Sequence, residues 1–220
     1  QDGVNRVLID AVSYIVGAGV SGDLAEFGTM SGATSHILAQ FLAQTEQHWH
    51  VAESAHQTSG RKLHLFDSFI GLPDVDNEHD KNSPHYQAQV WKKGVCKDLN
   101  AIELRQLIEQ SLPAQRVLIY EGWFSDTLTL INAETKFALL HIDCDFYEST
   151  YQVLDYIFAR KMLADGCMIL FDDWNCNRAS PKFGERKAWL DILQKYPEIR
   201  YSDEGAYSVF GHKFIVHTEV

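Results

Sequence analysis

Short apolar runs alternate with segments of helical periodicity along almost the whole chain, and this alternation limits the possible folds most strongly. Helices are expected over residues 4–17, 33–47, 101–112, 150–163 and 184–197, where apolar side chains recur at helical spacing. Strands are expected within residues 21–27, 62–69, 116–124, 136–145 and 166–174. Apolar strands that alternate with helices indicate a mostly parallel sheet covered on both faces. The sequence therefore predicts an α/β fold with a doubly wound sheet.

The end of the chain departs from this alternation. Two strand-like pieces flank Gly211 within residues 207–217, with no helix between them. Such a pair is typical of an antiparallel hairpin, here at one edge of the sheet. The length of 220 residues suits one domain, residues 1–220, since no stretch has the composition of a linker.

Charge and apolar pattern argue against two classes of partner. The formal net charge of −11 argues against binding nucleic acid through phosphate neutralisation. No apolar stretch approaches the roughly 20 residues needed to span a bilayer. The four cysteines lack the spacing of a zinc site, and Cys144 and Cys167 lie in apolar runs. We expect a cytoplasmic protein of a reducing compartment that binds neither membrane nor nucleic acid.

Two segments lack a regular pattern. Residues 71–95 are polar and contain proline, and they predict a mobile loop, either a lid that contacts an acceptor through Tyr86 and Trp91 or a solvated loop. Residues 48–61 predict a second surface loop.

Carboxylates follow nearly every predicted strand. In an open α/β sheet, ligands bind outside the carboxyl ends of the strands, near the reversal of strand order. The acids at these ends are Glu26, Asp67, Glu121, Asp143, Asp145, Asp172 and Asp173. Because so many acids come to one edge, this edge is the predicted binding site.

The turn in "EFGTMSG", after the first strand, indicates a cofactor site. Gly28 and Gly32 permit close approach of the backbone to a ligand. The pattern E-x-G-x-x-x-G differs from the dinucleotide fingerprint, and Glu26 suits a ligand with a positively charged amino group or sulfonium. Asp67 stands where such folds place the acid that binds ribose hydroxyls. An adenosine-containing cofactor is predicted; a plain strand–turn–helix connection and a loop acid are the alternatives.

Three of the acids are expected to converge from neighbouring strands. Asp143, Asp172 and Asp173 offer oxygen ligands without histidine or thiolate, which suits Mg²⁺. A cation would also offset the repulsion between Asp143 and Asp145 and leave Asp145 as a general base beside the metal. Solvated strand ends are the alternative for these acids.

Five motifs together are similar to those of the macrocin and mycinamicin family of O-methyltransferases. They run from about residue 20 to about residue 175 and read "GDLAEFGTMSG", "LFDSFIGLP", "YEGWFSDTL", "HIDCDFYESTYQVLDYI" and "GCMILFDDW". The resemblance implies an enzyme that depends on S-adenosylmethionine and Mg²⁺. It also implies the class I methyltransferase fold, with seven strands and a final antiparallel hairpin. His141 and Cys144 depart from the pattern of the family.

The resemblance further implies a role for each site residue. Asp143, Asp172 and Asp173 match the metal ligands, and Asp145 matches the general base. Related catechol methyltransferases carry a lysine base three residues after the first metal acid, where this chain has Phe146. The residues implied at the cofactor are Glu26, Gly28, Thr29, Met30, Ser31, Thr34, Asp67, Ser68, Gly122, Trp123, Phe124 and Asp143.

The predicted function is S-adenosylmethionine- and Mg²⁺-dependent methylation of a hydroxyl on a natural product, on a sugar or a vicinal diol. A catechol or phenol acceptor is the alternative substrate class, and a non-catalytic module that binds the cofactor is the alternative to an enzyme. A nicotinamide-dependent oxidoreductase would need G-x-G-x-x-G, which this chain lacks. By analogy with related enzymes a homo-oligomer is expected, with the helix over 4–17 as a candidate interface.

Overall fold

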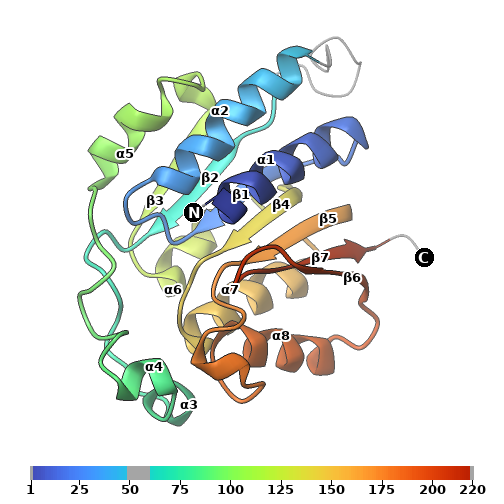
Figure 1. Ribbon diagram of the computed structural model, residues 1–220. Helices are drawn as coiled ribbons and strands as arrows, with labels where there is room; N and C mark the ends of the chain where they lie inside the picture. Colours follow the sequence, from blue (N-terminus) through green and yellow to red (C-terminus); the bar gives the residue numbers. More distant parts are fainter. Residues whose placement is uncertain (1, 49–59, 219–220) are drawn as a thin grey trace.

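Seven strands form one sheet in the part of the chain that the computed structural model describes, residues 2–48 and 60–218 (Figure 1). They are β1 (Asp23–Phe27), β2 (Leu63–Asp67), β3 (Val117–Glu121), β4 (Phe137–Ile142), β5 (Leu163–Phe171), β6 (Arg200–Ala206) and β7 (His212–His217). The order is β3-β2-β1-β4-β5-β7-β6, with β1 to β5 parallel and β7 antiparallel to both of its neighbours. The predicted α/β fold with a doubly wound sheet is confirmed.

Helices cover both faces of the sheet (Figure 1). One face carries α1 (Asp2–Gly17), α2 (Ala33–His48) and α5 (Ala101–Ile108), and the other carries α6 (Phe124–Thr127), α7 (Tyr147–Ala159) and α8 (Gly184–Lys195). Short 3₁₀ turns occur at η2 (Ala114–Arg116), η3 (Leu128–Leu130) and η4 (Asn177–Ala179). The central strand β4 is buried along its whole length, so Leu139 packs into one apolar core and Leu140 into the other. Burial of each such side chain contributes about 1.5–3 kcal/mol.

The strand order reverses between β1 and β4, and this reversal sets the place of the site. The N–H of Gly28 donates to the carbonyl oxygen of Phe66, and the N–H of Asp143 donates to that of Phe27, both at 2.9 Å. The ladder therefore continues to the last residue of each strand. As a result, the turns that follow β1 and β4 lie side by side at the carboxyl edge of the sheet.

Residues 71–95, predicted as a loop, are folded onto this edge (Figure 1). They contain α3 (Glu78–Lys81) and α4 (Pro84–Gln87), each of which begins at a side-chain N-cap. Trp91 is only 5% exposed and packs in a small apolar cluster with Phe146 and Cys176. The segment is thus anchored by two capped helices and by buried residues such as Val75 and Trp91, although Val90 is 56% exposed. Its role as a lid stays a prediction.

The C-terminal hairpin is confirmed, but its first strand lies entirely before the predicted segment 207–217. β6 ends at Ala206, and residues 207–211 form the connection to β7. Tyr207 leaves the strand because its hydroxyl donates to the carbonyl oxygen of Phe171 at 2.9 Å, and its ring covers Gly211, where a Cβ would collide with it. The apolar residues that suggested a strand lie in the connection, where Val209 is 79% exposed.

The surface loop predicted over residues 48–61 falls almost entirely outside the described residues. Among the helices that are described, none is both long enough and apolar enough to cross a bilayer.

Candidate active site

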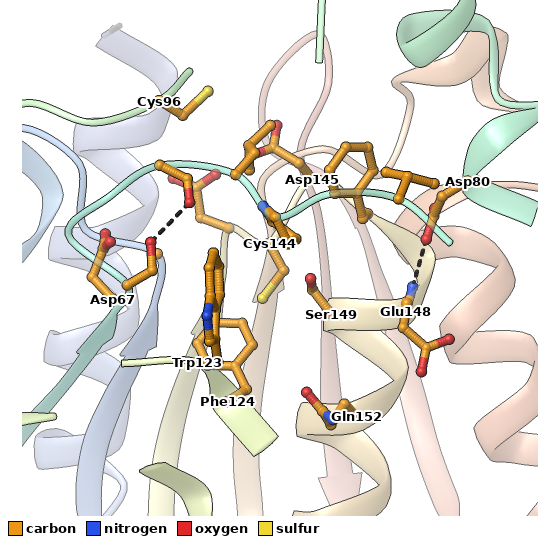
Figure 2. Close-up of a pocket in the computed structure, with 18 of the residues that line it drawn as sticks. Asp67, Asp80, Cys96, Trp123, Phe124, Cys144, Asp145, Glu148, Ser149 and Gln152 are labelled. Carbon is orange, nitrogen blue, oxygen red and sulfur yellow. Dashed lines mark hydrogen bonds between the residues drawn. The ribbon is translucent and has the colours of Figure 1, made fainter. Parts of the chain in front are cut away.

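A cavity of about 830 Å³ opens at the carboxyl edge of the sheet (Figure 2). Its walls come from the ends of β1 to β5, from residues 71–77 and from the N-terminal part of α7. Its volume lies in the usual range for small-molecule sites. The predicted site residues that line it are Gly28, Thr29, Met30, Asp67, Ser68, Gly122, Trp123, Phe124, Asp143, Asp145, Asp172 and Asp173.

The turn after β1 is packed directly against the end of β4. Gly28 has a φ of 94°, and a Cβ at this position would collide with the carbonyl oxygen of Asp143. Only glycine combines this backbone conformation with so close an approach. The predicted cofactor turn and the first predicted metal acid are therefore immediate neighbours.

The carboxylate of Asp67 holds this turn in place. One oxygen accepts hydrogen bonds from the backbone N–H groups of Thr29 and Met30, at 2.7 and 3.0 Å, and from the Thr29 hydroxyl at 3.0 Å. The other oxygen accepts the N–H of Phe69 at 2.7 Å. Asp67 thus joins the turns after β1 and β2. Its predicted contact with a ribose stays a prediction, and the second oxygen has the greater free capacity for it.

Glu26 does not line the cavity, in contrast to its predicted contact with the cofactor. Its side chain is fully buried, where it lies 2.9 Å from His141 Nδ1 and accepts a hydrogen bond from the Ser35 hydroxyl. Although burial lowers the pKa of His141, the hydrogen bond and charge of Glu26 raise it to about 9. The cation that Glu26 requires is therefore supplied by this chain. Ser31 and Thr34 also lie outside the cavity lining.

The predicted base lies in a turn that departs from the extended strand. Asp145 has a φ of 60°, a left-handed conformation, and the N–H of Phe146 closes the turn on the carbonyl oxygen of Cys144 at 2.6 Å. This turn directs Asp145 toward Asp173, with which its side chain shares a hydrogen bond. A hydrogen bond between two carboxyl groups requires that one of them carries the proton.

Burial and mutual repulsion shape the protonation of these acids. Burial raises the pKa of Asp143, and the negative charges of Asp173 and Asp172 raise it further. Burial also raises the pKa of Asp145, and the charge that adds most to this is that of Asp173. Burial is also the main reason why the pKa of Asp173 is raised to about 6. The described residues that line the cavity include no Lys, Arg or His that could neutralise the cluster.

The predicted metal ligands are neighbours, but they do not form a metal site as they stand. Within residues 2–48 and 60–218, no three His, Cys, Asp or Glu side chains are arranged so that they could hold a metal ion. The acids have other partners instead. The Tyr207 hydroxyl, which donates to Phe171, lies 3.1 Å from an oxygen of Asp172, and the Cys176 thiol donates to Asp173 at 3.1 Å. The donor set, oxygen only and without an internal cation in the cavity, fits Mg²⁺ in its chemistry. Binding would require these side chains to turn from their present partners.

Part of the cavity wall carries an open aromatic surface. Trp123, two residues after β3, is 39% exposed beside the cavity, and Phe124 packs edge-on against Phe27 with the ring centroids 5.8 Å apart. Gly122 has a φ of 137° and its N–H donates to the carbonyl oxygen of Asp67 at 3.0 Å. This bond connects the aromatic wall to the acid that holds the cofactor turn.

Sequence reasoning missed several residues of the site. Glu148, Ser149 and Gln152 line the cavity from α7, at a spacing that a helical wheel would have placed on one face (Figure 2). Asp80, from α3, lines it beside them. Glu185 is fully buried behind the acid cluster. No local signal identified Asp80 or Glu185, because both act through partners distant in the sequence.

The fold is that of the class I methyltransferases, as solved structures show. The O-methyltransferase NovP has a TM-score of 0.72 and 22% identity, over 97% of this chain and 79% of its own. The calicheamicin methyltransferase CalS11 has a TM-score of 0.71 and 23% identity, over 96% of this chain and 77% of its own. The seven-stranded sheet with its antiparallel hairpin is the fold that these solved methyltransferases share with this chain.

The chain belongs to the macrocin-O-methyltransferase (TylF) family, whose model matches residues 4–193. Demethyldecarbamoylnovobiocin O-methyltransferase of Streptomyces niveus is 26% identical over 208 residues, which cover 93% of this chain and 73% of that protein. The 8-demethyl-8-(2,3-dimethoxy-alpha-L-rhamnosyl)-tetracenomycin-C 4'-O-methyltransferase of Streptomyces olivaceus is 28% identical over 165 residues, 74% of this chain and 57% of that protein. The family predicted from the motifs is confirmed, and with it an O-methyltransferase that uses S-adenosylmethionine.

Proposed function

We propose that the chain methylates a hydroxyl of a sugar, or of another vicinal diol, on a natural product, with Mg²⁺ bound at the acid cluster. The observation that carries this proposal is the packing of Gly28 against Asp143, which puts the cofactor turn and the acids in one cavity. Methyl transfer is an in-line displacement, so alignment of donor and acceptor contributes most, about 7–11 kcal/mol when it is good. A cavity that holds both partners supplies this alignment.

The cofactor residues divide between the two ends of S-adenosylmethionine. The turn at Gly28, Thr29 and Met30 would contact the methionine end, next to Asp143. The second oxygen of Asp67 would accept a hydrogen bond from a ribose hydroxyl. Ser68 would lie beside the ribose, while its own hydroxyl donates to the carbonyl oxygen of Gly71 at 2.8 Å. The exposed ring of Trp123, with Phe124 beside it, offers a flat apolar surface for the adenine.

Asp143, Asp172 and Asp173 would hold the metal, and Asp145 would take the proton from the acceptor hydroxyl. A bound Mg²⁺ ion would supply Lewis-acid stabilisation of the acceptor oxygen. Asp145 lies in the same cavity as the metal acids, within hydrogen-bonding reach of Asp173. A proton acceptor at this position needs to reach the hydroxyl directly or through one water.

The acceptor wall favours a sugar over a phenol. Beyond the acid cluster, the cavity is lined by several hydrogen-bonding side chains as well as by apolar ones such as Leu72 and Val75; the polar ones include Asp76, Asn77, Glu148, Ser149 and Gln152. Such groups match a ring that bears several hydroxyls. The name of one relative supports this, because it acts on a rhamnosyl-tetracenomycin.

The setting of the enzyme is also part of the proposal. A reducing, cytoplasmic location fits the four free cysteines, Cys96, Cys144, Cys167 and Cys176. A homo-oligomer stays a prediction by analogy, and light scattering on the purified protein tests it. If α1 takes part, it does so through its exposed side, since its apolar residues pack in the core shared with α2.

Two measurements test the proposal. The first is calorimetric titration of wild type with S-adenosylhomocysteine, where micromolar binding is expected. The second is mass-spectrometric detection of methyl transfer from S-adenosylmethionine to rhamnosylated natural products and to catechol, with Mg²⁺ or with EDTA. We expect wild type to methylate a glycoside, and EDTA to abolish this turnover. Asp145→Asn should lower the turnover by roughly a hundredfold or more. Asp10→Asn, a change at an exposed residue of α1, should leave it unchanged.

The outcomes separate the alternatives. If the enzyme methylates catechol and none of the glycosides, the proposed acceptor is a phenol and not a sugar. Turnover that resists EDTA would remove Mg²⁺ from the proposal and leave the methyltransferase. Cofactor binding with no turnover on any acceptor would favour a non-catalytic module.

A further inference from the structure

Residues 71–95, here called the strap, do more than line the cavity. Most of the strap is polar, yet Val75, Asp80, Ser83 and Trp91 are each buried. A buried aspartate requires hydrogen-bonding partners. One partner of Asp80, the Asn77 side chain, lies within the strap and donates to it at 2.8 Å, whereas two others lie on the helix that follows the predicted base.

Asp80 caps α7 from a distance in the sequence. Its side chain is 1% exposed, and its two oxygens accept the backbone N–H groups of Tyr147 at 2.8 Å and Glu148 at 3.0 Å (Figure 2). The first N–H groups of a helix have no partner within the helix, and the helix dipole favours a negative charge there. The local N-cap residue, Phe146, offers no side-chain hydrogen bond. Asp80, 67 residues before Tyr147, takes that role.

The residue directly after Asp145 is held by the strap as well. The ring of Phe146 lies 5.8 Å from that of Trp91 and 6.3 Å from that of Tyr86, between ring centroids. The three residues that follow Asp145 in the chain therefore each contact the strap. The left-handed backbone of Asp145, with φ at 60°, persists only if its surroundings hold it. The strap supplies much of that support.

A second anchor ties the strap to the other acid-bearing turn. The backbone N–H of His85 donates to the side-chain oxygen of Asn177 at 2.9 Å, and the backbone N–H of Asn177 donates to His85 Nδ1 at 2.9 Å. Asn177 is 1% exposed and lies four residues after Asp173. The strap is thus attached beside both groups of acids.

We infer that Asp80 is a positioning residue for methyl transfer, which fixes the start of α7 and thereby the turn that presents Asp145. The inference rests on the proposed function, in which Asp145 is the base. An aspartate suits the position because both oxygens accept a backbone N–H. An asparagine has one such oxygen and would direct its own N–H₂ group at the second donor.

Hydrogen exchange and kinetics on the full chain test this role. Asp80→Asn is compared with wild type and with Glu78→Gln, a change on the same short helix at a side chain that is 81% exposed. With S-adenosylhomocysteine bound, we expect roughly tenfold faster exchange at residues 145–149 and 84–91 in Asp80→Asn only. Exchange in β4 and the dissociation constant of S-adenosylhomocysteine are expected to stay within about twofold of wild type.

The kinetic readout separates positioning from plain stabilisation. On the glycoside that wild type methylates, kcat of Asp80→Asn is expected to fall roughly tenfold or more while KM for S-adenosylmethionine is unchanged. If Asp80→Asn does not fold, Asp80→Ser, which retains one neutral acceptor, takes its place in both measurements.

Each result decides the role of Asp80. Exchange equal to that of wild type in residues 145–149 would overturn the inference, and so would faster exchange with unchanged kcat, which would leave Asp80 a purely structural cap. Failure of wild type to bind S-adenosylhomocysteine would instead reject the proposed function, and the positioning role would be rejected with it.

Discussion

The carboxylate of Glu185 accepts a hydrogen bond from the backbone N–H of Asp173 at 2.9 Å. Its other oxygen accepts the N–H of Cys144 at 3.4 Å, and the side chain is completely buried. Cys144 lies between Asp143 and Asp145, so one carboxylate links the two turns that carry all four acids. Burial and the charges of Asp173 and Asp143 raise the pKa of Glu185.

Glu185→Gln is therefore expected to disturb the site more than its small change in shape suggests. Glutamine has one acceptor oxygen for two N–H donors, and a buried donor left without a partner costs about 1–3 kcal/mol. The free energy of unfolding in urea should fall by this amount, and methyl transfer should fall with it. Glu198→Gln, on an exposed residue after α8, is the matched control. Equal stability of the two variants would show that Glu185 does not hold the turns.

Loss of His141 is expected to be more damaging than loss of a surface histidine. His141→Leu leaves Glu26 buried without its cation, which typically costs about 3–5 kcal/mol. The double variant Glu26→Leu/His141→Leu should recover much of this loss, because no buried charge remains. His212→Leu breaks an ion pair with Asp203, whose side chain is 57% exposed, and should cost less than about 1 kcal/mol. Urea unfolding at pH 7 measures all three, and similar losses for the two single variants would contradict the prediction.

Asp173→Asn is expected to stabilise the protein without metal while it abolishes activity. Removal of one of several clustered carboxylates relieves the repulsion that raises the pKa of Asp143 and Asp145, so the free energy of unfolding should rise. In thermal melts with and without Mg²⁺, wild type should gain stability from the ion and the variant should not. An equal gain from Mg²⁺ in both proteins would exclude Asp173 as a ligand.

Trp123→Ala is expected to weaken cofactor binding. Stacking of a base on an aromatic ring is worth about 1–3 kcal/mol, so the dissociation constant of S-adenosylhomocysteine should rise by roughly tenfold to a hundredfold. Phe210→Ala, at a ring that is 51% exposed in the connection between β6 and β7, serves as the control. Calorimetry on both variants provides the comparison, and unchanged affinity in Trp123→Ala would place the adenine elsewhere.

Asp155 gives a prediction for pH. Although burial raises the pKa of Asp155, hydrogen bonds from Lys195 and Tyr196, at 2.6 and 2.7 Å, hold it below the ordinary value of 3.8. A carboxyl group whose pKa is lower in the folded than in the unfolded state stabilises the protein at any pH above its unfolded-state pKa. This stabilisation is lost as the pH falls through the lower, folded-state pKa. Asp155→Asn should therefore cost about 0.5–1 kcal/mol at pH 7 and less below about pH 4. A difference in unfolding free energy that stays constant over this range would contradict the assignment.

The sequence by itself determined the parallel strands, the five long helices and the family, but not strand β6 or the short helices α3 and α4. Apolar runs alternating with helical periods leave few alternatives to a parallel sheet covered on both faces, because each run can be buried only in such a layer. The motifs around Gly28, Asp67, Asp143 and Asp172 also located the cavity, since parallel strands end at one edge. These inferences succeeded because they depend on local pattern and on a general rule of topology.

Only the tertiary structure decided how the side chains pair. The partner of Glu26 is His141, 115 residues away, and the cap of α7 is Asp80, 67 residues away. Contacts between such distant residues depend on which strands are neighbours and on how the strap folds, and no local spacing encodes them. The same holds for the acid cluster: the sequence brought the acids together, but the turn at Asp145 and the contact with Tyr207 decided where they point. Local pattern limits the backbone, whereas burial forces each polar group to find a partner wherever the fold provides one.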